Sequence, residues 1–163
     1  MDYLYCIVGC VKMNNRFFNN AETNTITLYN QKTDGTYQRS ILSNVYLRKV
    51  RKSIINSKGE QVASSATVII PTAYATINGK LAINSFIDCK SADKQNAMLN
   101  FTLNAPLIEN PWTLIDGDYI VDKANNMDFD LRKLKKDFRV FRIQSVADNR
   151  KGNLKHFKLE VLE

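Results

Sequence analysis

Few residues of this chain have the type and spacing needed for acid–base or metal chemistry. Only one of the 163 residues is a histidine, His156. It alternates with Lys158 and Glu160 on the polar face of an expected strand, which favours a surface or interface role over a catalytic base. A metal site built from several histidines is excluded. Nucleophile-elbow, P-loop, dinucleotide-binding and HExxH motifs are absent from the sequence. We therefore expect no enzymatic activity and no cofactor.

Carboxylates in the C-terminal third are the remaining candidates for binding a cation. They are Asp116, Asp118, Asp122, Asp128 and Asp130. Their spacing does not match a calcium-binding loop. Asp116 and Asp118 flank Gly117, and turn chemistry explains that arrangement better than metal binding does. The sequence therefore predicts no metal site.

Three cysteines, Cys6, Cys10 and Cys89, complete the set of reactive residue types. An odd number of cysteines without a CxxC pair argues against a disulfide framework and against a zinc ribbon. Cys6 and Cys10 are most simply read as small buried apolar residues. The number and spacing of the cysteines favour an origin in a reducing, intracellular compartment.

Positive charge is concentrated in three clusters. The chain has 23 lysines and arginines against 16 acidic residues, a formal charge of +7. The first cluster lies at the end of an expected strand and in the polar segment after it: Arg48, Lys49, Arg51, Lys52 and Lys58. The second is Arg132, Lys133, Lys135, Lys136, Arg139 and Arg142, and the third is Arg150, Lys151, Lys155 and Lys158. A basic loop on a rigid β-body could line a DNA channel through sequence-independent, salt-sensitive contacts. The first cluster contains no aromatic residue, so base stacking is not indicated.

The elements that must position these residues are mostly strands. Short runs of β-branched and aromatic residues separated by turn signals predict a small β-barrel or sandwich with one short helix and a long projecting loop. The expected strands are Thr25–Asn30, Tyr37–Val50, Thr67–Pro71, Tyr119–Val121, Phe138–Val146 and Leu154–Leu162. A short strand over Lys80–Cys89 and a helix near Asp93–Asn100 are also expected. Leu131, Leu134 and Phe138 form a helical stripe that begins near Asp128 or Asp130.

This pattern predicts one domain. We expect residues 1–24 to be an N-terminal extension and residues 25–163 to form a single barrel-like unit, because the length suits one domain of roughly 100–200 residues. The apolar run Leu4–Val11 is far shorter than the roughly 20 residues that cross a bilayer. No membrane partner is therefore expected.

Two motifs in the C-terminal third resemble those of a known family. Residues 112–121 read W-x-L-x-x-G-D-x-I-V, and residues 141–150 read F-x-I-x-S-V-x-D-N-R. A final strand bearing His156 follows them. The opening strand Thr25–Asn30 and the strand end Ile70-Pro71 match the same proteins. Together these features resemble small virion proteins of tailed phages and prophages of Gram-positive bacteria, of the head–tail joining type known as head-completion or stopper proteins.

That resemblance implies a structural role. It implies a barrel or sandwich with a long loop, no enzymatic activity, and assembly as a ring of six or twelve copies. The ring would surround non-specifically bound double-stranded DNA in the virion neck, between the portal or adaptor and the tail, after assembly in the bacterial cytoplasm. Trp112, Gly117, Asp118, Asp148 and Asn149 are then fold signatures: a core anchor, turn residues and turn-stabilising side chains.

Two other functions remain open at this stage. A tail-completion or tail-terminator protein at the adjacent position in the virion would have almost the same sequence pattern. A nucleic-acid-binding β-barrel with a regulatory or processing role would instead bind free DNA tightly at low salt.

Overall fold

The computed structural model describes the backbone of residues 23–56 and 59–163, and the side chains of residues 23–50 and 64–163. The strands are β1 (Asn24–Gln31), β2 (Tyr37–Asn56), β3 (Gly59–Pro71), β4 (Thr76–Ile77), β5 (Lys80–Leu81), β6 (Tyr119–Val121), β7 (Val140–Asp148) and β8 (His156–Leu162). The α-helices are α2 (Lys94–Asn104) and α3 (Leu131–Asp137), and two 3-10 helices are η2 (Ala82–Ser85) and η3 (Ala105–Leu107). No helix in this described part is both long and apolar enough to cross a membrane.

Six strands close into an antiparallel β-barrel. Their order is β1-β6-β7-β8-β3-β2, and β2 pairs back with β1 to complete the circuit. The two-residue strands β4 and β5 form a small annex on the edge of β2. Each of the six strands therefore has a paired neighbour on both sides, although the three-residue β6 covers only part of β1 and β7. The predicted mainly-β barrel is thereby confirmed.

Local signals in the sequence explain most of these strands. The turn between β1 and β2 places Gly35 at φ +82°, and the Asp34 carboxylate accepts hydrogen bonds from the backbone and side chain of Thr36. Strand β8 alternates as its pattern predicts, because Phe157, Leu159 and Val161 are buried. These inward positions join the corresponding residues of β1, β3 and β7 in one core cluster.

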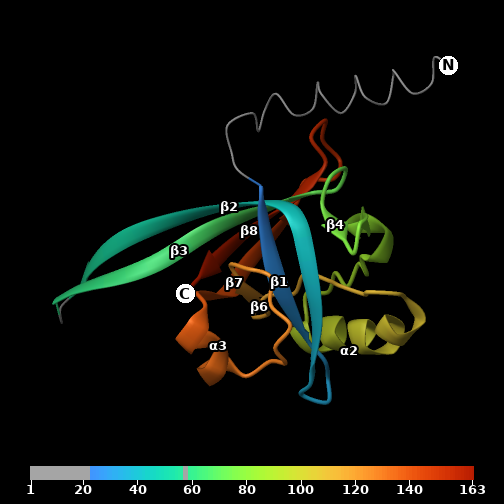
Figure 1. Cartoon of the computed structure of the whole chain (residues 1–163), viewed down its shortest axis with the longest axis horizontal. Helices are drawn as coiled ribbons and strands as arrows, with labels where there is room; N and C mark the ends of the chain where they lie inside the picture. The colour runs from blue at the N-terminus through green and yellow to red at the C-terminus, as the bar shows by residue number, and fades with distance from the viewer. Residues whose placement is uncertain (1–22, 57–58) are drawn as a thin grey trace.

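The two α-helices lie outside the barrel wall (Figure 1). Asp130 caps the N-terminus of helix α3. Its carboxylate accepts hydrogen bonds from the backbone amides of Arg132 and Lys133 at 3.0 and 3.2 Å. Its apolar stripe is anchored by the fully buried Leu134. Helix α2 packs Ala97, Met98 and Phe101 into a second apolar cluster. The helix predicted near Asp93–Asn100 is thereby confirmed, and it extends to Asn104.

The strand predicted over Lys80–Cys89 is wrong beyond Leu81. The chain turns instead into η2, and tertiary bonds engage its backbone. The Ala82 amide donates to the Ala75 carbonyl at 2.8 Å, and the indole nitrogen of Trp112 donates to the Ala82 carbonyl at 2.6 Å. Both backbone groups of Ala82 are used in these two bonds, so the segment does not continue as a strand.

Candidate assembly and DNA-facing surface

The long loop expected after the second strand is a two-stranded hairpin. Strand β2 pairs with β1 only as far as Val45, and β3 pairs with β8 only from Ser65 onward. Between these limits and the turn, β2 and β3 pair with each other in unbroken antiparallel register from Tyr46↔Ile69 to Asn56↔Gly59. We call residues 51–56 and 59–64 the arm, because among the described strands they pair only with each other. Figure 1 shows the arm extending away from the barrel.

The arm corrects the boundary expected for this region. The sequence predicts a polar segment after a strand that ends at Val50. The backbone instead continues as strand to Asn56 and resumes at Gly59. Polar alternating sequences satisfy backbone hydrogen bonds in a hairpin without needing a buried face. Lys58 of the first basic cluster lies outside the described residues.

Basic residues of the first cluster lie at the root of the arm. The side chains of Arg48 and Lys49 are exposed, at the last barrel positions of β2. The Lys49 ammonium forms an ion pair with the Asp122 carboxylate, which is largely shielded from solvent. Arg51 and Lys52 are the first two residues of the arm. The cluster is therefore brought together along one strand as it leaves the barrel.

The second basic cluster is divided between two roles. Arg132, Lys133, Lys135 and Lys136 are exposed around α3. Lys133 is near the capping carboxylate of Asp130. Arg139 instead makes a two-point contact with the Glu163 carboxylate, its closest distance being 2.6 Å, and this contact lowers the pKa of Glu163. The exposed residues around α3 form a second positively charged surface.

The acidic residues of the C-terminal third are dispersed. Asp118 is buried, Asp122 pairs with Lys49, and Asp130 caps α3. Asp116 and Asp128 are exposed. No group of three or more potential metal ligands occurs in the described ranges 23–56 and 59–163.

Asp118 is the centre of a buried polar network. Its carboxylate accepts hydrogen bonds from the Asn30 side-chain amide at 2.7 Å and from the Gln31 backbone amide at 3.1 Å. The other end of the Asn30 side chain accepts from the Thr113 backbone amide at 3.1 Å. Burial raises the pKa of Asp118 to about 6, and the hydrogen bonds from Asn30 and Gln31 oppose that rise. The network fastens the end of β1 to the segment before β6.

The neighbouring motif residues are also used structurally. Trp112 is buried against Phe86 and Phe157, with ring centroids 4.8 and 6.0 Å away. Gly117 has φ +92°, and a Cβ there would lie 2.6 Å from the Lys94 ammonium nitrogen. The positive φ is what favours glycine here, because the end of the flexible Lys94 side chain could move away from a Cβ.

The second motif closes the β7–β8 hairpin. Asp148 accepts from the backbone amide of Arg150 at 3.1 Å and pairs with its guanidinium at 2.7 Å. That guanidinium also reaches Asp88 at 2.8 Å, and it lies over the rings of Phe86 and Phe157 at 5.3 and 4.9 Å. The hydrogen bonds from Arg150 and from the Lys90 ammonium hold the pKa of Asp148 well below its usual range. Arg150 thus locks the hairpin onto the segment after η2.

His156 completes the same hairpin. Its Nδ1 is 2.6 Å from the Leu154 carbonyl, so that nitrogen carries the proton and donates. Its Nε2 is then free to accept from the Asn149 side-chain amide at 3.0 Å. The Asn149 backbone amide donates to the His156 carbonyl at 3.0 Å. Both ring nitrogens are therefore used to hold the hairpin.

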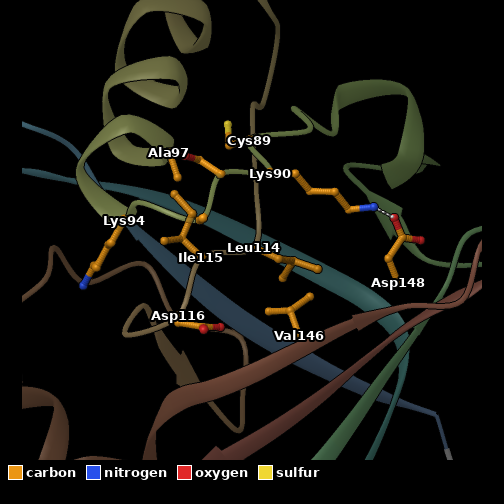
Figure 2. Close-up of a pocket in the computed structure, with 11 residues that line it drawn as sticks. Cys89, Lys90, Lys94, Ala97, Leu114, Ile115, Asp116, Val146 and Asp148 are labelled. Carbon is orange, nitrogen blue, oxygen red and sulfur yellow. Dashed lines mark hydrogen bonds and ion pairs between the residues drawn. The ribbon is translucent and has the colours of Figure 1, made fainter.

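A cleft of about 460 Å³ separates α2 from β7. Leu114, Ile115 and Val146 form its apolar floor, and the Lys90 ammonium reaches across to Asp148 at 2.5 Å (Figure 2). The nearby thiol of Cys89 is buried, which raises its pKa. A protonated thiol and a paired lysine do not make a nucleophile–base pair.

The sequence alone did not identify several residues that hold the barrel together or lie on its surface. Asn30 and Arg150 were not assigned structural roles, although D-N-R and the strand-ending asparagine are visible in the sequence. The exposed leucines of α2 were also missed, because the helix has apolar residues on two faces and only one of them faces the core.

Residues 21–161 match a family model described as a family of unknown function (DUF6751). No curated protein and no solved structure matches the chain.

Proposed function

This chain belongs to the DUF6751 family of unknown function, and we propose that it is a structural protein of a tailed-phage neck, of the head-completion or stopper type. In this role it forms a ring around the DNA channel between the portal or adaptor and the tail. The proposal includes the virion as its location and no catalytic activity.

The observation that carries the proposal is the basic root of an arm projecting from a closed barrel. The motif residues of the C-terminal third are engaged in packing and hydrogen bonds, as described for Trp112, Asp118 and Arg150. The arm and the exposed cation of Arg48 at its root are not used in this way and are available to partners. A β-ribbon with basic residues at its root suits a channel wall that contacts the DNA backbone without reading its sequence.

Support also comes from the two sequence motifs. They occur in the order and spacing of the phage proteins that the chain resembles, and in the fold they build one end of a single barrel. A shared structural framework is what such a resemblance predicts, and the neck role is carried over from it by analogy.

The test is co-purification with the neighbouring virion proteins of its own phage or prophage. A tagged full chain is co-expressed with the portal and adaptor in one culture and with the tail-tube protein in another. We expect recovery with the portal complex, and density for this chain in a reconstruction of the assembled neck. Recovery only with the tail tube would assign the chain to the tail-completion position instead.

A reconstructed neck that lacks this chain would overturn the proposal. The free-DNA alternative is tested with the isolated chain, by gel shift of double-stranded DNA in low salt. The exposed cations around α3 are the feature that favours this alternative. Tight, salt-sensitive binding combined with absence from the particle would support a nucleic-acid-binding module.

A further inference from the structure

Four charged side chains gather where the arm leaves the barrel. Lys49 of β2 pairs with Asp122, which follows β6. Arg139, which precedes β7, pairs with Glu163, which follows β8. The Asp122 amide also donates to the Arg139 carbonyl at 3.3 Å. The pKa of Glu163 is lowered chiefly by its hydrogen bonds from Arg139 and further by the charge of Lys49, so the two ion pairs form one cluster.

The two pairs differ in their exposure to solvent. The Asp122 side chain is only 6% exposed, so separating it from Lys49 would leave a shielded carboxylate without a cation. The Arg139 and Glu163 side chains are 34% and 33% exposed. Dissolved ions can reach this second pair, and exposed ion pairs contribute little net free energy. We call Lys49–Asp122 the inner pair, which is fixed, and Arg139–Glu163 the outer pair, which can exchange partners.

Glu163 connects the outer pair to the arm. Its backbone amide donates to the Ser64 carbonyl at 3.0 Å, and its carboxylate forms a hydrogen bond with the Ser64 side chain. Ser64 is the last arm residue on β3, and the register of β3 with β8 ends beside it at Ser65↔Leu162. Figure 1 shows the C-terminus next to the root of the arm. Glu163 therefore bonds the arm directly, and Arg139 holds Glu163 in place.

A phosphate group has the chemistry to compete with the Glu163 carboxylate. Arg139 contacts that carboxylate through Nε and Nη2, at 3.3 and 2.6 Å. A guanidinium offers the same two donors to two oxygens of a phosphate. The proposed function brings DNA phosphates to the root of the arm, where Arg48 is exposed one residue before Lys49.

We propose that Glu163 is a latch on the arm, and that a DNA phosphate opens it by taking Arg139 from Glu163. The inference rests on the proposed function for the source of the phosphate, whereas the latch itself can be measured without DNA. Once Glu163 is displaced, the arm loses its bonds at Ser64 and keeps its own ladder and the inner pair. Two-stranded ribbons have little stability of their own, so the arm then opens more often. Phosphate binding and release of the arm promote each other.

Hydrogen exchange of the full chain tests the latch in the absence of DNA. Glu163→Gln and Arg139→Gln should each speed exchange of the arm amides by about threefold, because each removes the outer pair. The matched control is Glu109→Gln, which removes the same charge from another ion pair, Lys80–Glu109, and should leave the arm unchanged. Unchanged exchange in the first two variants, or an equal increase in the control, would overturn the latch.

The phosphate step is tested with sodium phosphate against sodium chloride at equal ionic strength. Inorganic phosphate is too small to cover the arm, so a change in exchange of the arm amides reports the latch. Phosphate should speed this exchange in the wild type and not in Arg139→Gln, in which the latch is already open. Equal exchange of the wild type in the two salts would overturn the proposed competition.

Affinity for DNA separates the latch from a general effect of charge. By fluorescence anisotropy with a short double-stranded DNA of mixed sequence, Glu163→Gln should bind about threefold more tightly than wild type, because Arg139 no longer has a competing carboxylate. Arg139→Gln should bind more weakly, although it also loosens the arm. Equal gains from Glu163→Gln and Glu109→Gln would reject the DNA step.

These outcomes are distinct from failure of the neck role. A reconstructed neck without this chain would reject the neck role and leave the exchange results standing. An arm that does not respond to Glu163→Gln, in a chain that is present in the neck, would reject the latch alone.

Discussion

The barrel body and the arm differ in how their residues are used. In the barrel body, the side chains of Trp112, Asp118 and Arg150 contact residues that are distant in sequence. In the arm, β2 and β3 pair only with each other among the described strands. The recognisable motifs therefore build the framework, and the surface available to partners has an ordinary sequence. Substitutions should separate these two regions by their effect on unfolding and on assembly.

The largest effect on stability is expected at Trp112. Trp112→Ala should lower the free energy of unfolding by about 3–5 kcal/mol, because it leaves a cavity in the core. It also leaves the Ala82 carbonyl without its indole donor. Urea unfolding followed by circular dichroism measures the loss. Trp112→Phe is the matched control, and it should retain most of the apolar contact while losing the hydrogen bond. A loss below about 1 kcal/mol for Trp112→Ala would contradict its role as core anchor.

A large pH-dependent effect is expected at Asp118. Its pKa is raised from 3.8 to about 6 in the folded chain. The folded state therefore binds this proton more tightly than the unfolded state does. The resulting stabilisation is fully present below pH 3.8 and is lost as the pH rises through 6, a change of about 3 kcal/mol.

Comparison of wild type with Asp118→Asn isolates this group from other carboxylates, such as Asp148, whose lowered pKa gives the opposite trend. Urea unfolding from pH 4 to pH 7 should show the stability difference moving in favour of wild type as the pH falls. A difference independent of pH would mean that Asp118 is ionised throughout this range.

A smaller loss is expected at Arg150. Arg150→Lys keeps the charge but removes the planar group that bonds Asp148 and Asp88 and covers two aromatic rings. We expect a loss of about 1–3 kcal/mol in the free energy of unfolding. Arg132→Lys on the exposed face of α3 is the control and should leave the free energy of unfolding unchanged. Equal stability of the two variants would show that the contacts of the guanidinium with the aromatic rings add nothing to stability beyond its charge.

The smallest effect on stability, and the sharpest separation of the two regions, is expected at Arg48. Arg48→Glu should change the free energy of unfolding by less than about 0.5 kcal/mol, because the side chain is exposed. It should nevertheless weaken recovery with the DNA-filled neck. Arg132→Glu makes the same charge change on α3 and should not. Identical losses from both variants would indicate a general charge effect with no special role for the arm.

The fold was largely predictable because most of it rests on local signals. Alternation in Phe157, Leu159 and Val161 and the Asp34-Gly35 turn identify their elements without reference to the rest of the chain. The strand predicted from Lys80 failed because distant groups, including Trp112, hold that backbone. The network of Asn30 and Asp118 was equally invisible, since its members are 88 positions apart.

The candidate surface was only partly predictable. The basic residues at 48–52 could be read from the sequence, but their placement along one continuous strand could not, because polar alternation also suits an irregular loop. The exposure of the α2 leucines was not predicted for the opposite reason: apolar residues in a helix are normally assigned to the core.

The continuity of β2 has a mechanical consequence. This single 20-residue strand changes partner from β1 to β3 between Val45 and Tyr46, next to Asn44, which has φ +60°. The Asn24 side chain accepts from the Leu47 amide at 3.1 Å and so braces the same point. A load applied to the end of the arm is carried along an unbroken backbone to the β1–β2 ladder, where it acts in shear across many hydrogen bonds at once. The arm and the barrel are therefore mechanically coupled through β2, at the point where that strand leaves β1.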